Sequence, residues 1–192
     1  MFVKDTVFDM SHTRILISGA PGSGKSTVIS ALEARNHCVY HEVIRELTQE
    51  LLLSKQNENY RNPLEALDDY LDFNERLFFA RLQDFFHSTL TPHSFYDRSF
   101  VDVVAYMDFF NQTPPDYFRS YCKQFRYDLL FYFDPWEEIY EKDSERLETF
   151  KDVLNLNTTL KEYYTCLGYT PITVPTGTVE ERVEFIEKYL IR

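Results

Sequence analysis

Short apolar segments alternate with longer segments of helical periodicity along the whole chain. Apolar runs that predict buried β-strands lie at 14–18, 37–40, 94–97, 128–134 and 171–174. Apolar residues spaced three or four positions apart predict helices at 26–34, 42–53, 64–86, 101–110, 114–125, 150–167 and 178–190. Strands that alternate with helices favour right-handed crossovers, which place helices on both faces of a parallel sheet. The pattern therefore predicts a three-layer α/β fold with five strands, in a single domain over residues 1–192.

Three of the predicted helices carry further detail. Gly168 follows the helix 150–167 and can adopt the left-handed conformation that ends a helix. Thr178 precedes the last helix and is a good N-cap residue. We interpret the apolar face of the helix 64–86 as core packing, and it consists of Leu64, Leu67, Leu71, Phe78, Leu82 and Phe85.

A glycine-rich turn between the first strand and the first helix carries the strongest chemical signal. It fits the pattern G-x-x-x-x-G-K-[ST] at every fixed position, through Gly19, Ala20, Pro21, Gly22, Ser23, Gly24, Lys25 and Ser26. Such a turn aims consecutive backbone N–H groups at a phosphate, and the helix that follows adds partial positive charge. A chance glycine turn would not stand between a buried strand and a helix, so we interpret the segment as an ATP-binding phosphate loop.

The residues that close this motif have separate expected roles. Lys25 can reach the β- and γ-phosphates of ATP, and Thr27 can reach the α-phosphate. The hydroxyl of Ser26 can ligate Mg²⁺. The sequence thus predicts ATP and Mg²⁺ as the ligands of the loop.

A second candidate is the triplet Asp97-Arg98-Ser99, which ends the third predicted strand. Phosphate-loop proteins hold Mg²⁺ with an acid at the end of a neighbouring strand, and Asp97 has that position. Arg98 would pair with phosphate, as in the similar acid–arginine pairs of nucleoside and nucleotide monophosphate kinases. The alternative is a helix N-cap followed by a surface arginine.

Glu42 follows the second predicted strand, at the sheet edge where the phosphate loop lies. Ligands of open parallel sheets bind beyond this edge. Glu42 could take a proton from an attacking hydroxyl or hold a ribose diol, and Asp97 is an equal candidate for the base. The alternative for Glu42 is an acid that merely favours the start of a helix.

Two later segments complete the predicted site. Residues 135–149 are charged and irregular, and we interpret them as a lid, with Lys142 and Arg146 as candidate cations. Arg146 would stabilise charge on the γ-phosphate, and the alternative is a solvated helix with internal ion pairs. Thr176 and Gly177 follow the last strand, where they could contact adenine or form an ordinary turn.

Composition narrows the class of protein. The net charge is −11, which disfavours non-specific binding to nucleic acid. No stretch of about 18 apolar residues predicts a membrane span. The three cysteines are far apart and an N-terminal secretory pattern is absent, so we expect a cytoplasmic protein with reduced thiols. The guanine-reading Asn-Lys-x-Asp motif of GTPases is missing as well.

From residue 14 to 191 the chain resembles the NadR-like P-loop ATPase/kinase family, a small grouping described as an AAA domain. The resemblance rests on the segments ILISGAPGSGKSTVISALEARNHCVYHEVIREL, DRSFVDVVAY, FYFDPWEEIYEKDSERLETF and LGYTPITVPTGTVEERVEFI. It implies ATP and Mg²⁺ binding, the sheet order 2-3-1-4-5, and kinship with ribosylnicotinamide kinases. The adenylyltransferase domain and helix-turn-helix of full NadR proteins have no counterpart in this sequence.

These observations leave two hypotheses. The first is a kinase that transfers the γ-phosphate of Mg-ATP to a hydroxyl of a small nucleoside-like metabolite. The second is an ATP-binding regulatory or partner-binding protein with slow hydrolysis. ATP consumption that depends on one metabolite would separate the two.

Overall fold

The computed structural model describes residues 12–44, 47–48, 70–87, 91–140 and 149–190. Its sheet contains β1 (Thr13–Gly19), β2 (Cys38–Tyr40), β3 (His93–Asp97), β4 (Leu129–Phe133) and β5 (Ile172–Thr173). All four neighbouring pairs are parallel and the order is β2-β3-β1-β4-β5. This confirms the predicted fold class and the strand order that the family resemblance implied.

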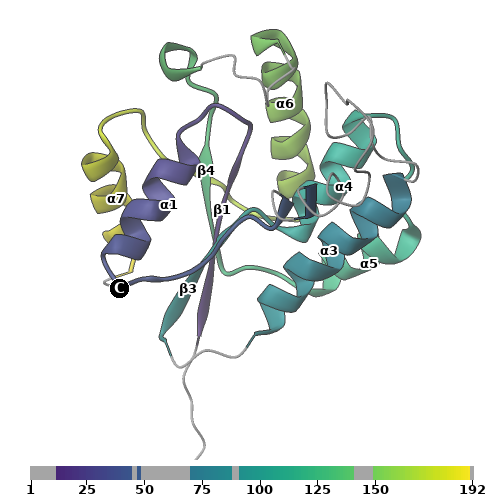
Figure 1. The fold of residues 1–192 in the computed structure, drawn as a ribbon, viewed down its shortest axis with the longest axis horizontal. Helices are drawn as coiled ribbons and strands as arrows, with labels where there is room; N and C mark the ends of the chain where they lie inside the picture. Colours follow the sequence, from purple (N-terminus) through teal and green to yellow (C-terminus); the bar gives the residue numbers. More distant parts are fainter. Residues whose placement is uncertain (1–11, 45–46, 49–69, 88–90, 141–148, 191–192) are drawn as a thin grey trace, which may run out of the picture.

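Helices lie on both faces of the sheet (Figure 1). They are α1 (Lys25–Ala34), α3 (Tyr70–Phe86), α4 (Phe100–Phe109), α5 (Asp116–Gln124), α6 (Phe150–Cys166) and α7 (Val179–Glu187), with a short 3₁₀ helix η2 (Glu137–Ile139). Helices α1 and α7 cover one face, and α3 to α6 gather on the other. Within the described residues, no helix has the length and apolar character needed to cross a membrane.

Strand β1 divides the core into two layers because its side chains alternate between the faces. Ile15 and Ile17 pack with α1 and α7, whereas Leu16 packs with the helices of the opposite face. All three side chains are fully buried. The central strand is therefore held from both sides, and its carboxyl end leads directly into the glycine-rich turn.

The structure corrects the predicted bounds of one helix and one strand, and the predicted burial of one residue. Glu42 precedes the helical residues, which begin at Ile44, and part of the predicted helix 42–53 lies outside the described residues, as do 64–69 of the helix 64–86. Leu71, predicted as part of the core, is 42% exposed, since it lies in the first described turn of α3 and the buried residues of that helix begin at Phe73. The last strand is shorter than predicted, although Val174 N–H still donates to the Tyr132 carbonyl.

Candidate nucleotide-binding and acceptor site

The glycine-rich turn follows β1 and opens α1, as its sequence predicted. Gly19 has a φ of +140°. A side chain there would overlap the backbone carbonyl of Phe133 on the neighbouring strand β4. The first glycine of the motif is thus required by the close approach of two strands, and the loop starts from a rigid support.

Lys25 is folded into the loop. Its Nζ donates hydrogen bonds to the Ala20 carbonyl at 2.7 Å and to the Ser23 Oγ at 3.0 Å. Burial, followed by the charge of Arg98, lowers the pKa of Lys25 to about 7, against the opposing effect of nearby carboxylates. A polyphosphate bound in this loop would favour the charged ammonium and so raise the pKa of Lys25 again.

Ser26 and Thr27 lie in the first turn of α1 and are exposed. The Thr27 hydroxyl donates to the Gly24 carbonyl at 2.9 Å. Both hydroxyls are accessible to a ligand at the helix N-terminus, where partial positive charge gathers.

Asp97 ends β3 beside the loop, since it pairs in register with Ile17 of β1. The side chain is 8% exposed and its Oδ1 has no hydrogen-bond partner. Burial raises the pKa of Asp97, and Glu42 raises it further, while Arg98, Lys25 and Arg81 oppose the shift. Mg²⁺ typically takes one or two protein oxygens together with phosphates and water, so the unpartnered Asp97 oxygen and the accessible Ser26 hydroxyl fit this ion.

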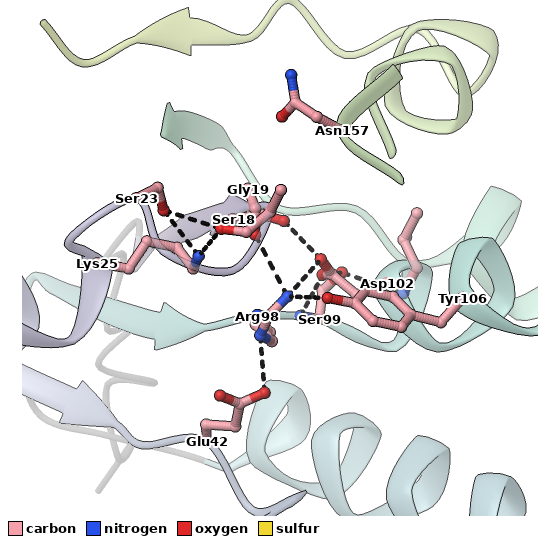
Figure 2. Close-up of polar contacts among 12 residues, drawn as sticks. Ser18, Gly19, Ser23, Lys25, Glu42, Arg98, Ser99, Asp102, Tyr106 and Asn157 are labelled. Atoms are coloured by element: carbon pink, nitrogen blue, oxygen red, sulfur yellow. Dashed lines mark hydrogen bonds and ion pairs between the residues drawn. The ribbon is translucent and has the colours of Figure 1, made fainter. Parts of the chain in front are cut away.

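Arg98 stands at the centre of the site (Figure 2). Its Nε lies 2.7 Å from the Glu42 Oε1, and its Nη1 donates to the Gly19 carbonyl at 3.3 Å and to the Tyr106 hydroxyl at 3.2 Å. The residue adopts a φ of +68°, which is unusual for a side chain of this size. Burial lowers the pKa of Arg98. The charges of Glu42, Tyr106 and two aspartates outweigh this effect, and the pKa is raised well above its ordinary value.

Glu42 binds two arginines through one oxygen. The same Oε1 lies 3.1 Å from the Nη2 of Arg81. Arg81, on α3, is 5% exposed and also donates from Nη1 to the Ser99 carbonyl at 2.9 Å. The structure therefore brings Glu42, Asp97 and Arg98 together beside the lysine of the loop, with Arg81 behind them.

Asp102 supports this group from α4. Its carboxylate accepts hydrogen bonds from Ser18 Oγ at 2.6 Å, Ser99 N at 2.8 Å, Ser99 Oγ at 3.0 Å and Tyr164 Oη at 2.6 Å. Although burial raises the pKa of Asp102, Arg98, Arg81 and the hydrogen bonds from Ser18 and Tyr164 lower it overall. A buried, ionised carboxylate thus connects β1, α4 and α6.

The roles predicted for the two later segments stay predictions. Thr176 is exposed, and the described residues form no hydrogen bond between the Thr176–Gly177 turn and the phosphate loop. Arg182, in the helix that follows this turn, does contact the phosphate loop, because its Nη2 donates to the Ser23 carbonyl at 3.0 Å. Lys142 and Arg146 of the predicted lid lie outside the described residues.

A comparison with protein families matches residues 14–182 to a family described as an AAA domain. The chain belongs to this family. No curated protein gives a significant match to the sequence.

Solved structures share the fold of this AAA-domain chain at low identity. A deoxyadenosine kinase from M. mycoides has a TM-score of 0.65 at 16% identity, over 93% of this chain and 98% of the kinase. A NadR protein in complex with NR has 0.64 at 14%, over 93% of this chain and 51% of its own. Thymidylate kinase from Ehrlichia chaffeensis has 0.53 at 13%, over 94% and 99%. The chain thus shares its fold with these two kinases and with the NadR protein, and it spans about half of the NadR chain.

Four residues of this AAA-domain chain lie at the site although the sequence analysis assigned no role to them. They are Arg81, Asp102, Tyr106 and Arg182. Arg81 gave a readable signal, because it follows Leu77 and Phe78 by four and three positions and so lies on the apolar stripe of its helix. Asp102 gave another, because Ser99-x-x-Asp102 has the spacing of a capping box.

Proposed function

We propose that the protein is a Mg-ATP-dependent kinase that transfers the γ-phosphate to a hydroxyl of a small nucleoside-like metabolite. The observation that carries this proposal is the placement of Glu42 and Arg98 next to Asp97 and the buried Lys25. A protein that only bound ATP would need the lysine and the metal-side acid, but not a second carboxylate held by two arginines.

The ATP side consists of the phosphate loop. The backbone N–H groups from Gly19 to Thr27, except at Pro21, which has none, would surround the polyphosphate. Lys25 would contact the β- and γ-phosphates. Ser26 and Asp97 would hold Mg²⁺, whose chemistry is to neutralise charge on the phosphates. Thr176 and Gly177 remain candidates for the adenine side, and Arg146 for closing the lid.

The strand order favours a division of labour between the two acids. Asp97 ends β3, next to β1 and its loop, whereas Glu42 follows β2, one strand farther from the nucleotide. We therefore assign Asp97 to the metal side and Glu42 to the acceptor. Glu42 would take the proton of the acceptor hydroxyl as its oxygen attacks the γ-phosphorus and the bond to ADP breaks.

Arg98 would pair with the phosphoryl group as it moves toward the acceptor. Its guanidinium already contacts both sides of the site, through Gly19 of the loop and Glu42 of the acceptor side. Because these contacts and its burial fix the side chain before any ligand binds, little reorganisation would be required at the moment of transfer.

The deciding experiment measures ADP release from the purified chain with Mg-ATP and a panel of nucleosides and vitamins. A kinase shows ADP release that rises strongly with one compound and yields its phosphorylated product. Glu42→Gln should suppress this rise while binding of a non-hydrolysable ATP analogue is retained. ATP turnover that ignores every compound but responds to a protein partner would support the regulatory hypothesis instead.

A further inference from the structure

Arg182 is a buried cation beside the phosphate loop. It lies in the first half of α7 and is only 3% exposed. Its guanidinium carbon is 4.4 Å from the ring centre of Phe133 and 5.7 Å from that of Trp136. Burial alone lowers its pKa, no carboxylate among the described residues pairs with it, and its Nε has no hydrogen-bond partner.

A buried charge without an opposite charge is unfavourable unless other interactions offset it. Here the two aromatic rings and the Ser23 carbonyl supply part of the compensation. What they do not supply is negative charge. Since no carboxylate of the described part of the chain pairs with Arg182, a polyphosphate bound in the adjacent loop would supply negative charge near it.

The same side chain also fixes a peptide unit of the loop. The Nη2 donates to the Ser23 carbonyl at 3.0 Å. In a trans peptide the carbonyl and the following N–H point in opposite directions, so the Gly24 N–H points away from Arg182. A Cβ at Gly24, where φ is +76°, would come within 2.6 Å of the Arg182 Nη1. The guanidinium therefore packs directly against this peptide.

We propose that Arg182 is a positioning and charge-supplying residue for the polyphosphate of the bound nucleotide. It fixes the Ser23–Gly24 peptide with its N–H away from α7, and it places behind the loop a buried positive charge that no carboxylate of the described residues pairs with. This inference rests on the proposed function only in requiring that the loop binds a nucleoside triphosphate. It is independent of the acceptor and of phosphoryl transfer.

The test measures the affinities of two ligands by calorimetry, each in the presence of Mg²⁺. One ligand is a non-hydrolysable ATP analogue and the other is inorganic tripolyphosphate. Arg182→Met keeps the apolar stem but removes the charge and the hydrogen bonds. We expect this substitution to lower the affinity for both ligands by about tenfold or more, as for loss of a charged hydrogen bond. Because a charge contact is lost, the variant's affinities should also vary less with salt than those of the wild type.

Arg126→Met is the matched control. Arg126 also stacks on an aromatic ring, 4.5 Å from the ring centre of Tyr169, and also donates to a backbone carbonyl, that of Leu167. These partners are residues that follow α6, whereas the hydrogen-bond partner of Arg182 is in the phosphate loop. This control should leave both affinities unchanged. Arg182→Lys, which keeps the charge, should recover part of the loss, and Arg182→Gln serves if the methionine variant does not fold.

The outcomes separate the possible failures. Equal affinities of the Arg182 variants and the wild type, with only a lower melting temperature, would overturn the inference. A loss confined to the ATP analogue, with tripolyphosphate unaffected, would also overturn it, because Arg182 would then act on the nucleoside. A wild-type chain that binds neither ligand would overturn the proposed function itself.

Discussion

The hydroxyl of Ser18 donates a 2.6 Å hydrogen bond to the Oδ1 of Asp102, which ties the end of β1 to the first turn of α4. The other oxygen of Asp102, Oδ2, accepts hydrogen bonds from the backbone N–H of the N-cap residue Ser99 and from the Tyr164 hydroxyl of α6. Arg98 stands between these groups, directly before Ser99 and 3.8 Å from Asp102 Oδ1. The position of the central arginine is therefore set by a carboxylate that itself lies away from solvent.

Replacing Asp102 with Asn tests this arrangement. The amide nitrogen cannot accept hydrogen bonds, so at least one of the four donors around the carboxylate loses its partner in a buried site. We expect a loss of about 2–4 kcal/mol in the free energy of unfolding, measured by urea denaturation. The kcat of the proposed kinase should fall as well, because Arg98 loses its support.

Asp152→Asn provides the comparison for Asp102. Asp152 forms the same type of capping box with Thr149 at the start of α6, but in an exposed position. Its replacement should destabilise the protein much less and leave kcat unchanged. Equal destabilisation by the two substitutions would mean that Asp102 acts only as a helix cap.

Lys25 should take up a proton when ATP binds. Burial lowers its pKa to about 7 in the free protein, so near pH 7 about half of the molecules carry a neutral amine. Polyphosphate raises this pKa because it favours the ammonium. Binding at pH 7 should therefore consume about half a proton per site, detected calorimetrically by comparing buffers of different ionisation enthalpy.

The direction of the Lys25 effect can be checked by varying pH. Uptake should decrease below pH 6, where the lysine of the free protein is already charged, and should increase toward pH 8. Lys25→Met is expected to abolish measurable binding of the ATP analogue. Proton release on binding, or uptake that does not depend on pH between 6 and 8, would contradict the assignment.

Arg146→Ala tests the predicted lid. From the sequence, Arg146 was predicted to stabilise the charge that develops on the γ-phosphate. We expect kcat to fall by about a hundredfold or more, while the affinity for the ATP analogue changes little, since such an arginine acts mainly in the transition state. Lys123→Ala, which removes an exposed cation in the last turn of α5, is the control. Unchanged kinetics of the Arg146 variant would remove it from the mechanism.

Local patterns predicted the elements of the fold well, since buried strands and capped helices leave signals within a few residues. The phosphate loop, the N-cap Thr178 and the left-handed Gly168 are local features of this type. Burial along a helix was harder to predict: the apolar period predicted Leu71 as core, but the buried residues of α3 begin only at Phe73.

The candidate site was only partly predictable for the same reason. Glu42, Asp97 and Arg98 were assigned because they follow strands of one sheet edge. Arg81 and Arg182 come from helices, and their contacts with Glu42 and Ser23 span 39 and 159 positions in the sequence. Periodicity placed both helices against the sheet, but it carries no information on which polar group a long side chain meets.

Arg81 and Glu42 should be energetically coupled. Arg81→Met leaves the Glu42 carboxylate with Arg98 alone and removes the hydrogen bond to the Ser99 carbonyl. We expect a loss of about 2–3 kcal/mol in unfolding free energy, because a buried charged group loses its partners. In activity, kcat should fall and the KM for the acceptor should rise, while the affinity for the ATP analogue is retained. A double-mutant cycle with Glu42→Gln measures the coupling, and strict additivity would show that Arg81 supports the helix without orienting Glu42.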